Sequence, residues 1–358
     1  MSYNVNLPVR GEHGCYEIRL ESIGGLGANV CGKILGELGA LYLNLNSASF
    51  ASYGSEKKGS PVKSYIRYSD NNVEIRISSP IESPHILAVF HDRLAGKQGV
   101  CAGVAGHTSV VLNTAENPDA ARDALKMPSG TLYAIDALKI ALECKTRVNM
   151  VMLGAIAKAS GFIPLEAVYE SVSDTFGKKY PQAMKGNIDG IKRGYDEAEA
   201  TVYADDGKYP YAPFAEPVSE LGWKTAPIGG VLQSYGSTVS NDLTASREGY
   251  IPVFIKEKCI HCGLCETTCP DFVYQFAEGE IKGKKAMVNL GPDYHHCKGC
   301  LRCVEICPTA AIVAGLEREN DITKTHVRNR DLVVGRLEFE SVGQSGWIES
   351  ESAVINEI

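Results

Sequence analysis

Two cysteine-rich runs near the carboxyl end restrict the structure of this chain more than any other pattern in it. The first reads CIHCGLCETTCP, from Cys259 to Pro270, and the second reads CKGCLRCVEICP, from Cys297 to Pro308. Both have the spacing C-x2-C-x2-C-x3-C-P, and they begin 38 residues apart. The segment is therefore an internal duplication.

Eight of the twelve cysteines lie within these 49 residues, which indicates metal binding. A disulfide framework suits a small exported domain, and we expect this chain of 358 residues to be neither small nor exported. Reduced thiolates are the better interpretation, and the doubled pattern is the one that two [4Fe–4S] clusters require. Two zinc ions are the alternative, although the third and fourth cysteines of each run would then be arranged unusually.

The spacing also predicts which sulfur binds which cluster. Three cysteines separated by two residues can hold three corners of a cubane, and in two-cluster ferredoxins the fourth cysteine of each run ligates the other cluster. We therefore expect cluster one to take Cys259, Cys262, Cys265 and Cys307. We expect cluster two to take Cys297, Cys300, Cys303 and Cys269.

Other polar residues of the two runs have smaller predicted roles. Because every cluster corner already has a cysteine, we expect His261, His295 and His296 to be exposed loop histidines. Lys298 and Arg302, inside the second run, flank cluster two, and their charge favours a less negative potential for that cluster. Clusters of this kind carry single electrons, so the runs predict electron transfer without a catalytic centre of their own.

Composition excludes several classes of partner. The net charge is −7, so no bulk electrostatic attraction draws the chain to nucleic acid or to an anionic membrane. No run of 18 apolar residues predicts a membrane span, and the first residues lack the apolar core of a secretion signal. We expect a cytoplasmic protein.

The first two hundred residues show the pattern of an α/β domain. Residues 15–22 alternate like a strand, residues 23–28 form a glycine turn, and residues 28–42 carry apolar side chains at helical spacing. Strand, turn and helix in this order predict the opening of a doubly wound, Rossmann-like sheet. Further strands are expected at residues 62–69, 85–90, 108–114 and 131–137.

Three later helices precede a change in composition. One is expected at 148–161, ending with Gly161 as a left-handed cap, one at 164–176 with Pro164 in its first turn, and a polar one at 181–200. Proline, glycine and aromatic residues then replace the helical pattern, which predicts a linker ordered against a surface. The predicted divisions are an α/β domain at 1–203, a linker at 204–250, an α+β two-cluster ferredoxin domain at 251–318 and an extension at 319–358.

The glycine turn matches a dinucleotide fingerprint only in part. Gly25 and Gly27 fit G-x-G-x-x-G, but Val30 stands where the third glycine belongs. Tight packing of strand against helix is the favoured use, although a ligand role for Gly24–Ala28 stays open. Lys57 and Lys58 lie in a glycine-rich loop that is either solvated or close to a phosphate or carboxylate.

Several stretches together resemble the 2-oxoacid:ferredoxin oxidoreductases, the family that includes pyruvate:ferredoxin oxidoreductase. The segments EIRLESIGGLGANVCGKILGELGA, YGSEKKGSPVKSYIRYSD and VNMVMLGAIAKASGFIPLEAVYESV resemble its gamma component. The segments GWKTAPIGG, PVFIKEKCIHCGLCETTCPD and HHCKGCLRCVEICPTAAI resemble its delta component. The likeness covers residues 15 to 315, so the chain looks like fused gamma and delta subunits, with a gamma-type domain at 1–203 and a delta-type domain at 251–318.

The resemblance implies a role in the oxidative decarboxylation of a 2-oxoacid. Thiamine diphosphate and Mg²⁺ would sit on separate alpha and beta subunits, because the GDG…N motif is absent here and the DDG at Asp205–Gly207 lies in the linker. Electrons would pass to ferredoxin, and coenzyme A would take the acyl group near the subunit interface. The chain departs from the family at Leu26, where glutamine is usual, and at Leu301, where glycine is usual, which predicts altered sheltering of cluster two.

The predicted function is therefore an electron-transfer subunit of a 2-oxoacid:ferredoxin oxidoreductase, with pyruvate the commonest substrate of the family. An oxidoreductase acting on an oxalate-type, branched-chain or aromatic 2-oxoacid is one alternative. A stand-alone electron carrier and a nucleotide-dependent reductase are two others. The sequence leaves the substrate, the subunit copy number and the role of residues 319–358 open.

Overall fold

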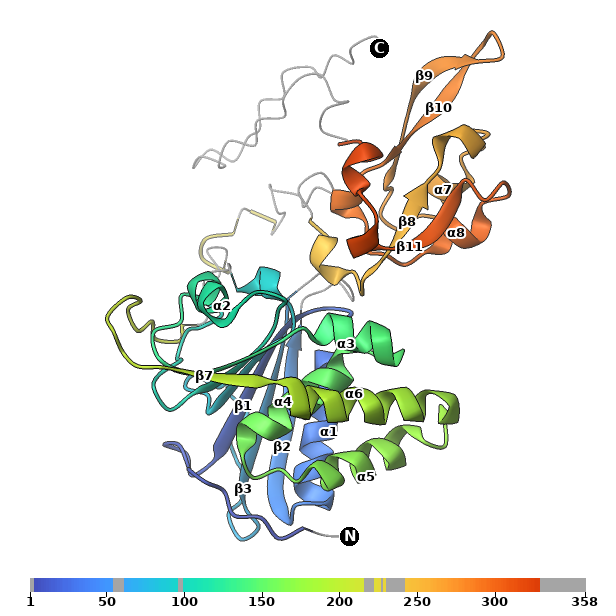
Figure 1. The fold of residues 1–358 in the computed structure, drawn as a ribbon. Coiled ribbons are helices and arrows are strands. Elements are labelled where there is room, and N and C mark those ends of the chain that lie inside the picture. The colour runs from blue at the N-terminus through green and yellow to red at the C-terminus, as the bar shows by residue number, and fades with distance from the viewer. Residues whose placement is uncertain are drawn as a thin grey trace. The chain divides into compact units, whose positions relative to one another are not determined.

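The structure, a computed structural model, describes residues 3–53, 61–95, 99–215, 222–226, 228–229 and 242–328. Contacts divide the chain into two compact units, Met1–Glu216 and Pro217–Ile358 (Figure 1). The residue boundaries predicted above for the four segments stay a prediction. Lys57, Lys58 and the extension from residue 329 onward lie outside the described residues.

In its described residues, the first unit combines one seven-stranded sheet with six α-helices. Its strands are β1 (Tyr16–Ile23), β2 (Leu45–Tyr53), β3 (Pro61–Asp70), β4 (Ile86–Val89), β5 (Ser109–Asn113), β6 (Gly130–Ile135) and β7 (Glu199–Tyr203). Its helices are α1 (Ala28–Leu41), α2 (Pro118–Leu125), α3 (Ala137–Cys144), α4 (Val148–Ser160), α5 (Leu165–Phe176) and α6 (Met184–Glu197).

The strand order is β2-β3-β1-β4-β5-β6-β7. Strands β1, β4, β5 and β6 pair in parallel. At one edge β3 pairs antiparallel with both β1 and β2, and at the other edge β7 pairs antiparallel with β6. Helix α1 packs on β1, β2 and β3, and α4 packs on β4, β5 and β6. Figure 1 shows α2 on the opposite side of the sheet from these helices. The predicted α/β class is confirmed, with a mixed sheet.

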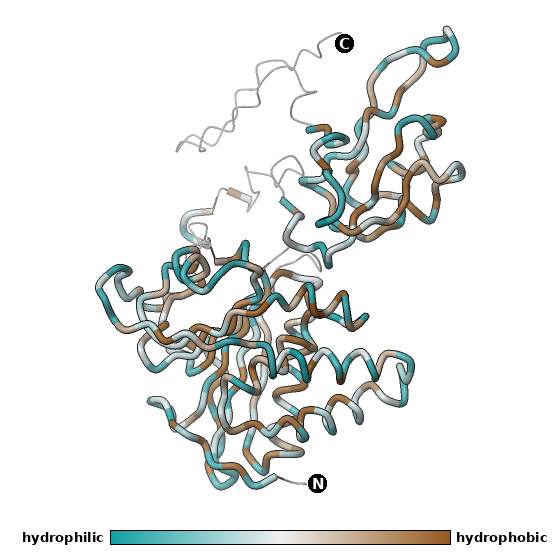
Figure 2. The backbone as a smooth tube through the Cα atoms, viewed as in Figure 1, coloured by the Kyte–Doolittle hydropathy of each residue, from teal (hydrophilic) through white to brown (hydrophobic). Residues whose placement is uncertain are grey.

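The core of this unit lies between the sheet and α4. Nearly every residue of α4 is buried, and Figure 2 shows hydrophobic residues along the inner strands and helices, with hydrophilic residues on the outer loops. Helix α4 crosses α6 closely because glycines meet there: a Cβ on Gly154 would lie 2.0 Å from the carbonyl oxygen of Ile191, and one on Gly194 would lie 2.0 Å from that of Val151. Only glycine permits this approach.

Strand β1 is buried along its whole length, although it carries three charged residues. The guanidinium of Arg19 is fully buried and donates hydrogen bonds to the carbonyl oxygens of Ile81, Val100 and Ala102, at 3.0, 3.0 and 2.7 Å. Loops on the face away from α1 supply these oxygens. A buried cation is tolerated because its terminal nitrogens are hydrogen-bonded and its Nε lies 3.3 Å from the carboxylate of Glu21, so Arg19 joins these loops to the central strand.

The second unit is a small α+β domain. It contains β8 (Tyr250–Phe254), α7 (Leu264–Thr267), β9 (Tyr274–Ile281), β10 (Lys284–Pro292), α8 (Arg302–Ile306) and β11 (Ile312–Leu316). Strand β8 pairs antiparallel with β11, and β9 forms a hairpin with β10. Helices α7 and α8 are the short turns inside the two cysteine runs. The unit therefore repeats one motif twice around a small core.

Most elements expected from periodicity are present, and a few were missed. The four later strands correspond to β3, β4, β5 and β6, and Gly161 ends α4 with a φ of 70°, as predicted. Pro164 precedes α5 as its N-cap, so its predicted place in the first turn was wrong. Strands β2 and β7 and helices α2 and α3 were not anticipated, because their apolar patterns are short and irregular.

The segment after β7 is only partly packed. Tyr209 bonds to Asp123, and Phe214 lies over the guanidinium of Arg19 at 5.2 Å and the ammonium of Lys63 at 5.4 Å. Trp223, by contrast, is 90% exposed, so the expectation that the linker's aromatic residues are covered does not hold for it.

No described helix is both long and apolar enough to cross a lipid bilayer.

Candidate metal centres

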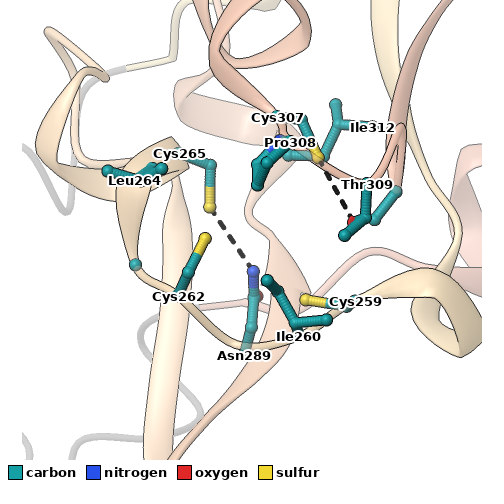
Figure 3. A pocket seen from close by; sticks show the side chains of 12 residues that line it. Cys259, Ile260, Cys262, Leu264, Cys265, Asn289, Cys307, Pro308, Thr309 and Ile312 are labelled. Atoms are coloured by element: carbon teal, nitrogen blue, oxygen red, sulfur yellow. Dashed lines mark hydrogen bonds between the residues drawn. The ribbon is translucent and has the colours of Figure 1, made fainter.

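The first candidate centre is a cavity lined by four cysteines from two separate runs. About 320 Å³ of space free of protein atoms, including open solvent at its mouth, lies beside Cys259, Cys262, Cys265 and Cys307. The first three come from the loop before α7 and from α7 itself, and Cys307 follows α8 (Figure 3). Ile260, Leu264, Thr309 and Ile312 complete the wall, so apart from the sulfurs this cavity is mainly apolar.

The second cavity has the same construction. It spans about 310 Å³, again including open solvent, and is lined by Cys297, Cys300, Cys303 and Cys269. Lys298, Leu301 and Arg302 take the places of Ile260, Gly263 and Leu264. The ammonium of Lys298 lies 3.0 Å from the carboxylate of Asp271, so this lysine's charge is compensated beside the cavity.

The duplication extends to the backbone. Three pairs of equivalent residues share a left-handed conformation, with positive φ: His261 and Gly299 (58° and 68°), Gly263 and Leu301 (76° and 60°), and Phe272 and Ala310 (48° and 49°). This conformation costs a non-glycine residue roughly 1–2 kcal/mol, so it is kept where the surrounding structure requires it. The chain must reverse there to bring successive cysteines to one cavity.

Donor groups point at several of the sulfurs. The backbone N–H groups of His261 and Gly299 donate to Cys259 and Cys297, each at 3.4 Å. The side-chain amide of Asn289 donates to Cys265 at 3.5 Å. Donors near cluster sulfurs help to set reduction potentials.

Asn289 was not identified from the sequence. Strand β10 carries an irregularity between Asn289 and Gly291, where the pairing register with β9 shifts. Such a bulge changes the direction of a side chain. The only local signal was the pair Asn289 and Gly291 near the end of a strand, which is too common to predict a ligand contact.

Burial favours the protonated form of four of these thiols, Cys265, Cys269, Cys297 and Cys303, in the absence of a metal. It raises the pKa of Cys265 and Cys297 to about 12 and that of Cys303 to about 11. Burial acts on Cys307 too, but backbone N–H groups of the following loop outweigh it, and the pKa of Cys307 is lowered. Metal binding at such a site must displace protons from sulfur, so it is coupled to pH.

Each cavity suits a cluster larger than one ion. Among the described residues, no three His, Cys, Asp or Glu side chains converge on a point where a single metal ion would be held. The four sulfurs surround a space instead. Tyr274 lines the second cavity, and its buried hydroxyl makes no hydrogen bond of ordinary geometry with a described residue, although it interacts with the side chain of Cys303. Four sulfur ligands and a nearby donor are what a [4Fe–4S] cube accepts.

A buried arginine supports the second cavity. Arg247, which precedes β8, donates to the carbonyl oxygen of Tyr294 at 2.8 Å and pairs with Glu317 at 2.8 Å. Its side chain lies beside Gly299, where a Cβ would come within 3.2 Å of it. Arg247 lies outside both cysteine runs, and no sequence pattern linked it to them.

The three histidines near the runs are not alike, and one prediction about them was wrong. His296 is 3% exposed and lies 3.5 Å from the carboxylate of Asp293, so it is not an exposed loop residue. Nδ1 of His261 accepts a hydrogen bond from the backbone N–H of Asn289 at 3.1 Å. His295 has 40% of its side chain accessible.

The glycine turn of the first unit is closely packed. A Cβ on Gly27 would lie 2.7 Å from Nδ2 of Asn149, and the turn residue Leu26 is buried in the core. This supports the packing use predicted for the turn. Asp206 of the DDG sequence pairs with Arg122 at 2.8 Å.

Comparison with known proteins identifies both units. The family model described as pyruvate ferredoxin/flavodoxin oxidoreductase matches residues 17–197, which is half of the chain. The chain belongs to this oxidoreductase family. A second model, the 4Fe-4S dicluster domain, matches residues 258–311 and confirms the prediction of iron–sulfur clusters.

Relatives within the oxidoreductase family match in two ways. Pyruvate synthase subunit PorC of Thermotoga maritima is 30% identical over 189 residues, 52% of this chain and 96% of the relative. Pyruvate:ferredoxin oxidoreductase of Moorella thermoacetica is 25% identical over 363 residues, 85% of this chain but 30% of the relative. The second match spans both units, which agrees with a gamma–delta fusion.

A crystal structure of pyruvate oxidoreductase subunit PORC from Thermotoga maritima also aligns with the first unit. It is 26% identical, with a TM-score of 0.46, and the alignment covers 52% of this chain and 99% of that one.

Proposed function

We propose that this chain is the fused gamma–delta electron-transfer subunit of a thiamine diphosphate-dependent pyruvate:ferredoxin oxidoreductase. It receives electrons from the oxidative decarboxylation of pyruvate and delivers them to ferredoxin. The observation that carries this proposal is a pair of four-cysteine cavities in a chain whose first unit belongs to the oxidoreductase family. No pattern for the decarboxylation chemistry occurs in the sequence.

The ligand assignment is part of the proposal. Cluster one is bound by Cys259, Cys262, Cys265 and Cys307, and cluster two by Cys297, Cys300, Cys303 and Cys269. Its support is that each set lines one cavity, three cysteines from one run and one from the other. When bound, the clusters accept and release single electrons.

The chain's own residues prepare these sites. Burial of Cys265, Cys297 and Cys303 excludes water from one side of each cavity, and N–H groups stabilise negative charge on sulfur. Cys262 and Cys300, the second cysteines of the two runs, are exposed. One edge of each cavity therefore lies near the surface, where electrons can enter or leave.

The partners follow because this chain transfers electrons and other subunits carry out the decarboxylation. Alpha and beta subunits carry thiamine diphosphate and Mg²⁺, and coenzyme A accepts the acyl group near their interface with this chain, in the cytoplasm.

The decisive experiment isolates the native complex without air, identifies its subunits and assays a panel of 2-oxoacids with ferredoxin. We expect co-purified thiamine-binding chains and the highest kcat/KM with pyruvate. A chain that purifies alone would contradict the proposal, and a different preferred acid would correct its substrate.

Single substitutions test the ligand sets. We expect Cys265→Ser and Cys307→Ser to damage cluster one, and Cys269→Ser to damage cluster two, because these cysteines line the corresponding cavities. Iron content and electron paramagnetic resonance report each loss from about eight irons per chain. Cys144→Ser, in the first unit, is the matched control and should keep all the iron. If Cys307→Ser affects cluster two, each run supplies its own four ligands.

A further test concerns coenzyme A. Lys57 and Lys58 lie outside the described residues, and the double variant Lys57→Ala with Lys58→Ala asks whether their loop is used. A raised KM for coenzyme A or weaker subunit assembly would support a functional loop. Normal kinetics in an intact complex would show that the loop is solvated and has no functional role.

A further inference from the structure

The two cavities differ at one pair of equivalent positions. Tyr274 lies five residues after Cys269, and Ile312 lies five residues after Cys307. Both side chains are buried, at 2% and 3% exposure, and each lines its own cavity. Cavity two therefore has a phenol hydroxyl where cavity one has only hydrocarbon.

The Tyr274 hydroxyl is buried beside the thiol of Cys303. Its oxygen is inaccessible to water and makes no hydrogen bond of ordinary geometry with a described residue, although it interacts with the Cys303 side chain. The neighbouring Tyr294 shows the ordinary arrangement, because its hydroxyl donates to the carbonyl oxygen of Pro252 at 2.7 Å. Burying an unpaired hydroxyl costs free energy, so such a group in a native site calls for a partner.

Cavity one shows what that partner is. There the side-chain amide of Asn289 donates to the sulfur of Cys265, the third cysteine of the first run. The equivalent third cysteine of the second run is Cys303, and its sulfur is a close electrostatic neighbour of the Tyr274 hydroxyl. Each cavity thus has a side-chain donor beside its third cysteine.

We propose that the Tyr274 hydroxyl donates a hydrogen bond to sulfur of cluster two beside Cys303 and holds the potential of that cluster less negative. This rests on the proposed function, since it requires a cluster in cavity two. Reduction adds one electron, and a donor stabilises the added negative charge. The electron comes from 2-oxoacid oxidation on the partner subunits, and Tyr274 keeps its proton throughout. Tyr274 therefore acts on electron transfer by setting the potential at which cluster two accepts an electron.

The test uses the full chain in its native complex, purified without air. Tyr274→Phe removes only the hydroxyl, and Tyr294→Phe is the matched control because its hydroxyl is paired with protein. Reductive titrations followed by electron paramagnetic resonance give the potential of each cluster. We expect the equilibrium constant for reduction of cluster two to fall about fivefold in Tyr274→Phe, or roughly 40 mV more negative, with cluster one unchanged. Tyr294→Phe should leave both potentials in place.

A second measurement covers the case in which Tyr274→Phe loses its clusters. Replacing every tyrosine with 3-fluorotyrosine keeps the hydroxyl and makes it a stronger donor. We expect cluster two to shift to a less negative potential in the labelled wild-type chain.

Different results would contradict the proposed function and this inference. A wild-type chain without iron and labile sulfide would overturn the proposed function itself. Two clusters in the wild type, combined with no shift of cluster two in Tyr274→Phe or in the labelled chain, would overturn this inference alone. An equal shift in Tyr274→Phe and Tyr294→Phe would also overturn it, because the effect would then be structural.

Discussion

Gly263 and Leu301 occupy equivalent positions of the two cysteine runs and share one backbone conformation, with φ and ψ of 76° and −6° for the glycine and 60° and 10° for the leucine. Each is the N-cap of the short helix that carries the third cysteine of its run. The duplicated fold thus demands a left-handed residue at both places, and only one of them is a glycine.

This equivalence predicts the effect of a methyl group at Gly263. No atom lies within 4 Å of a Cβ built there, so Gly263→Ala changes backbone strain and nothing else nearby. We expect the second unit to lose about 1 kcal/mol of stability, measured as the denaturant concentration at which the clusters are released. Gly222→Ala, at a glycine with open space and no positive φ, is the control. Equal stability of the two variants would contradict the strain argument.

Arg247 is predicted to hold the second unit together. Arg247→Met removes the ion pair with Glu317 and leaves the carbonyl oxygen of Tyr294 without its donor. Because Glu317 is partly exposed, we expect a loss of about 2–3 kcal/mol in the free energy of unfolding, less than a fully buried pair would cost. Anaerobic denaturation measures it. Arg318→Met, at an exposed neighbour, should change stability by less than about 0.5 kcal/mol, and a similar loss there would refute the assignment.

The first unit should become less stable as the pH falls below neutral. Burial, with a smaller contribution from His107, lowers the pKa of His85 to about 4, and Nδ1 of His85 accepts a hydrogen bond from the backbone N–H of Glu17 at 3.0 Å. The unfolded chain binds this proton near pH 6.5 and the folded chain only near pH 4. Stability is therefore complete above pH 6.5 and falls, by up to about 3 kcal/mol, as the pH decreases to 4.

Hydrogen exchange of peptides from β1 and β4, corrected for intrinsic rates, measures this loss in the full chain. His85→Asn keeps an acceptor but cannot titrate, so it should flatten the pH dependence. His13→Asn, at an exposed position, should leave it as in the wild type. An unchanged slope in His85→Asn would place the acid sensitivity elsewhere.

The crossing of α4 and α6 should not accept a methyl group. Gly154→Ala would bring Cβ against the carbonyl oxygen of Ile191, so the helices must separate. We expect the first unit to lose about 1–3 kcal/mol, the usual cost of overpacking, in thermal or denaturant unfolding. Gly106→Ala is the control, since its Cβ would meet its nearest neighbour, Oγ of Ser129, at 3.8 Å. Wild-type stability of Gly154→Ala would show that the helices can adjust.

Local patterns predicted many of the regular elements of the first unit. The helix at 148–161 and the strand at 62–69 were found because their apolar residues recur at the period of a helix or fill a buried strand. His296 was misjudged because its burial depends on Asp293 and on the packing of its unit. Periodicity carries no information about such contacts between loops.

The nature of the cofactor could be read from the residues alone, since three ligands of each cubane lie within seven consecutive positions and their spacing reflects the size of the cluster. The hydrogen-bond donors to the cysteine sulfurs could not be predicted from the sequence. Asn289 reaches Cys265 through a bulge in a hairpin, and Tyr274 lines the second cavity because β9 packs beside the second cysteine run. The order of the seven strands likewise depends on which buried faces pack best. Contacts between distant residues follow from the packing of the whole chain, and a linear pattern of side chains does not specify them.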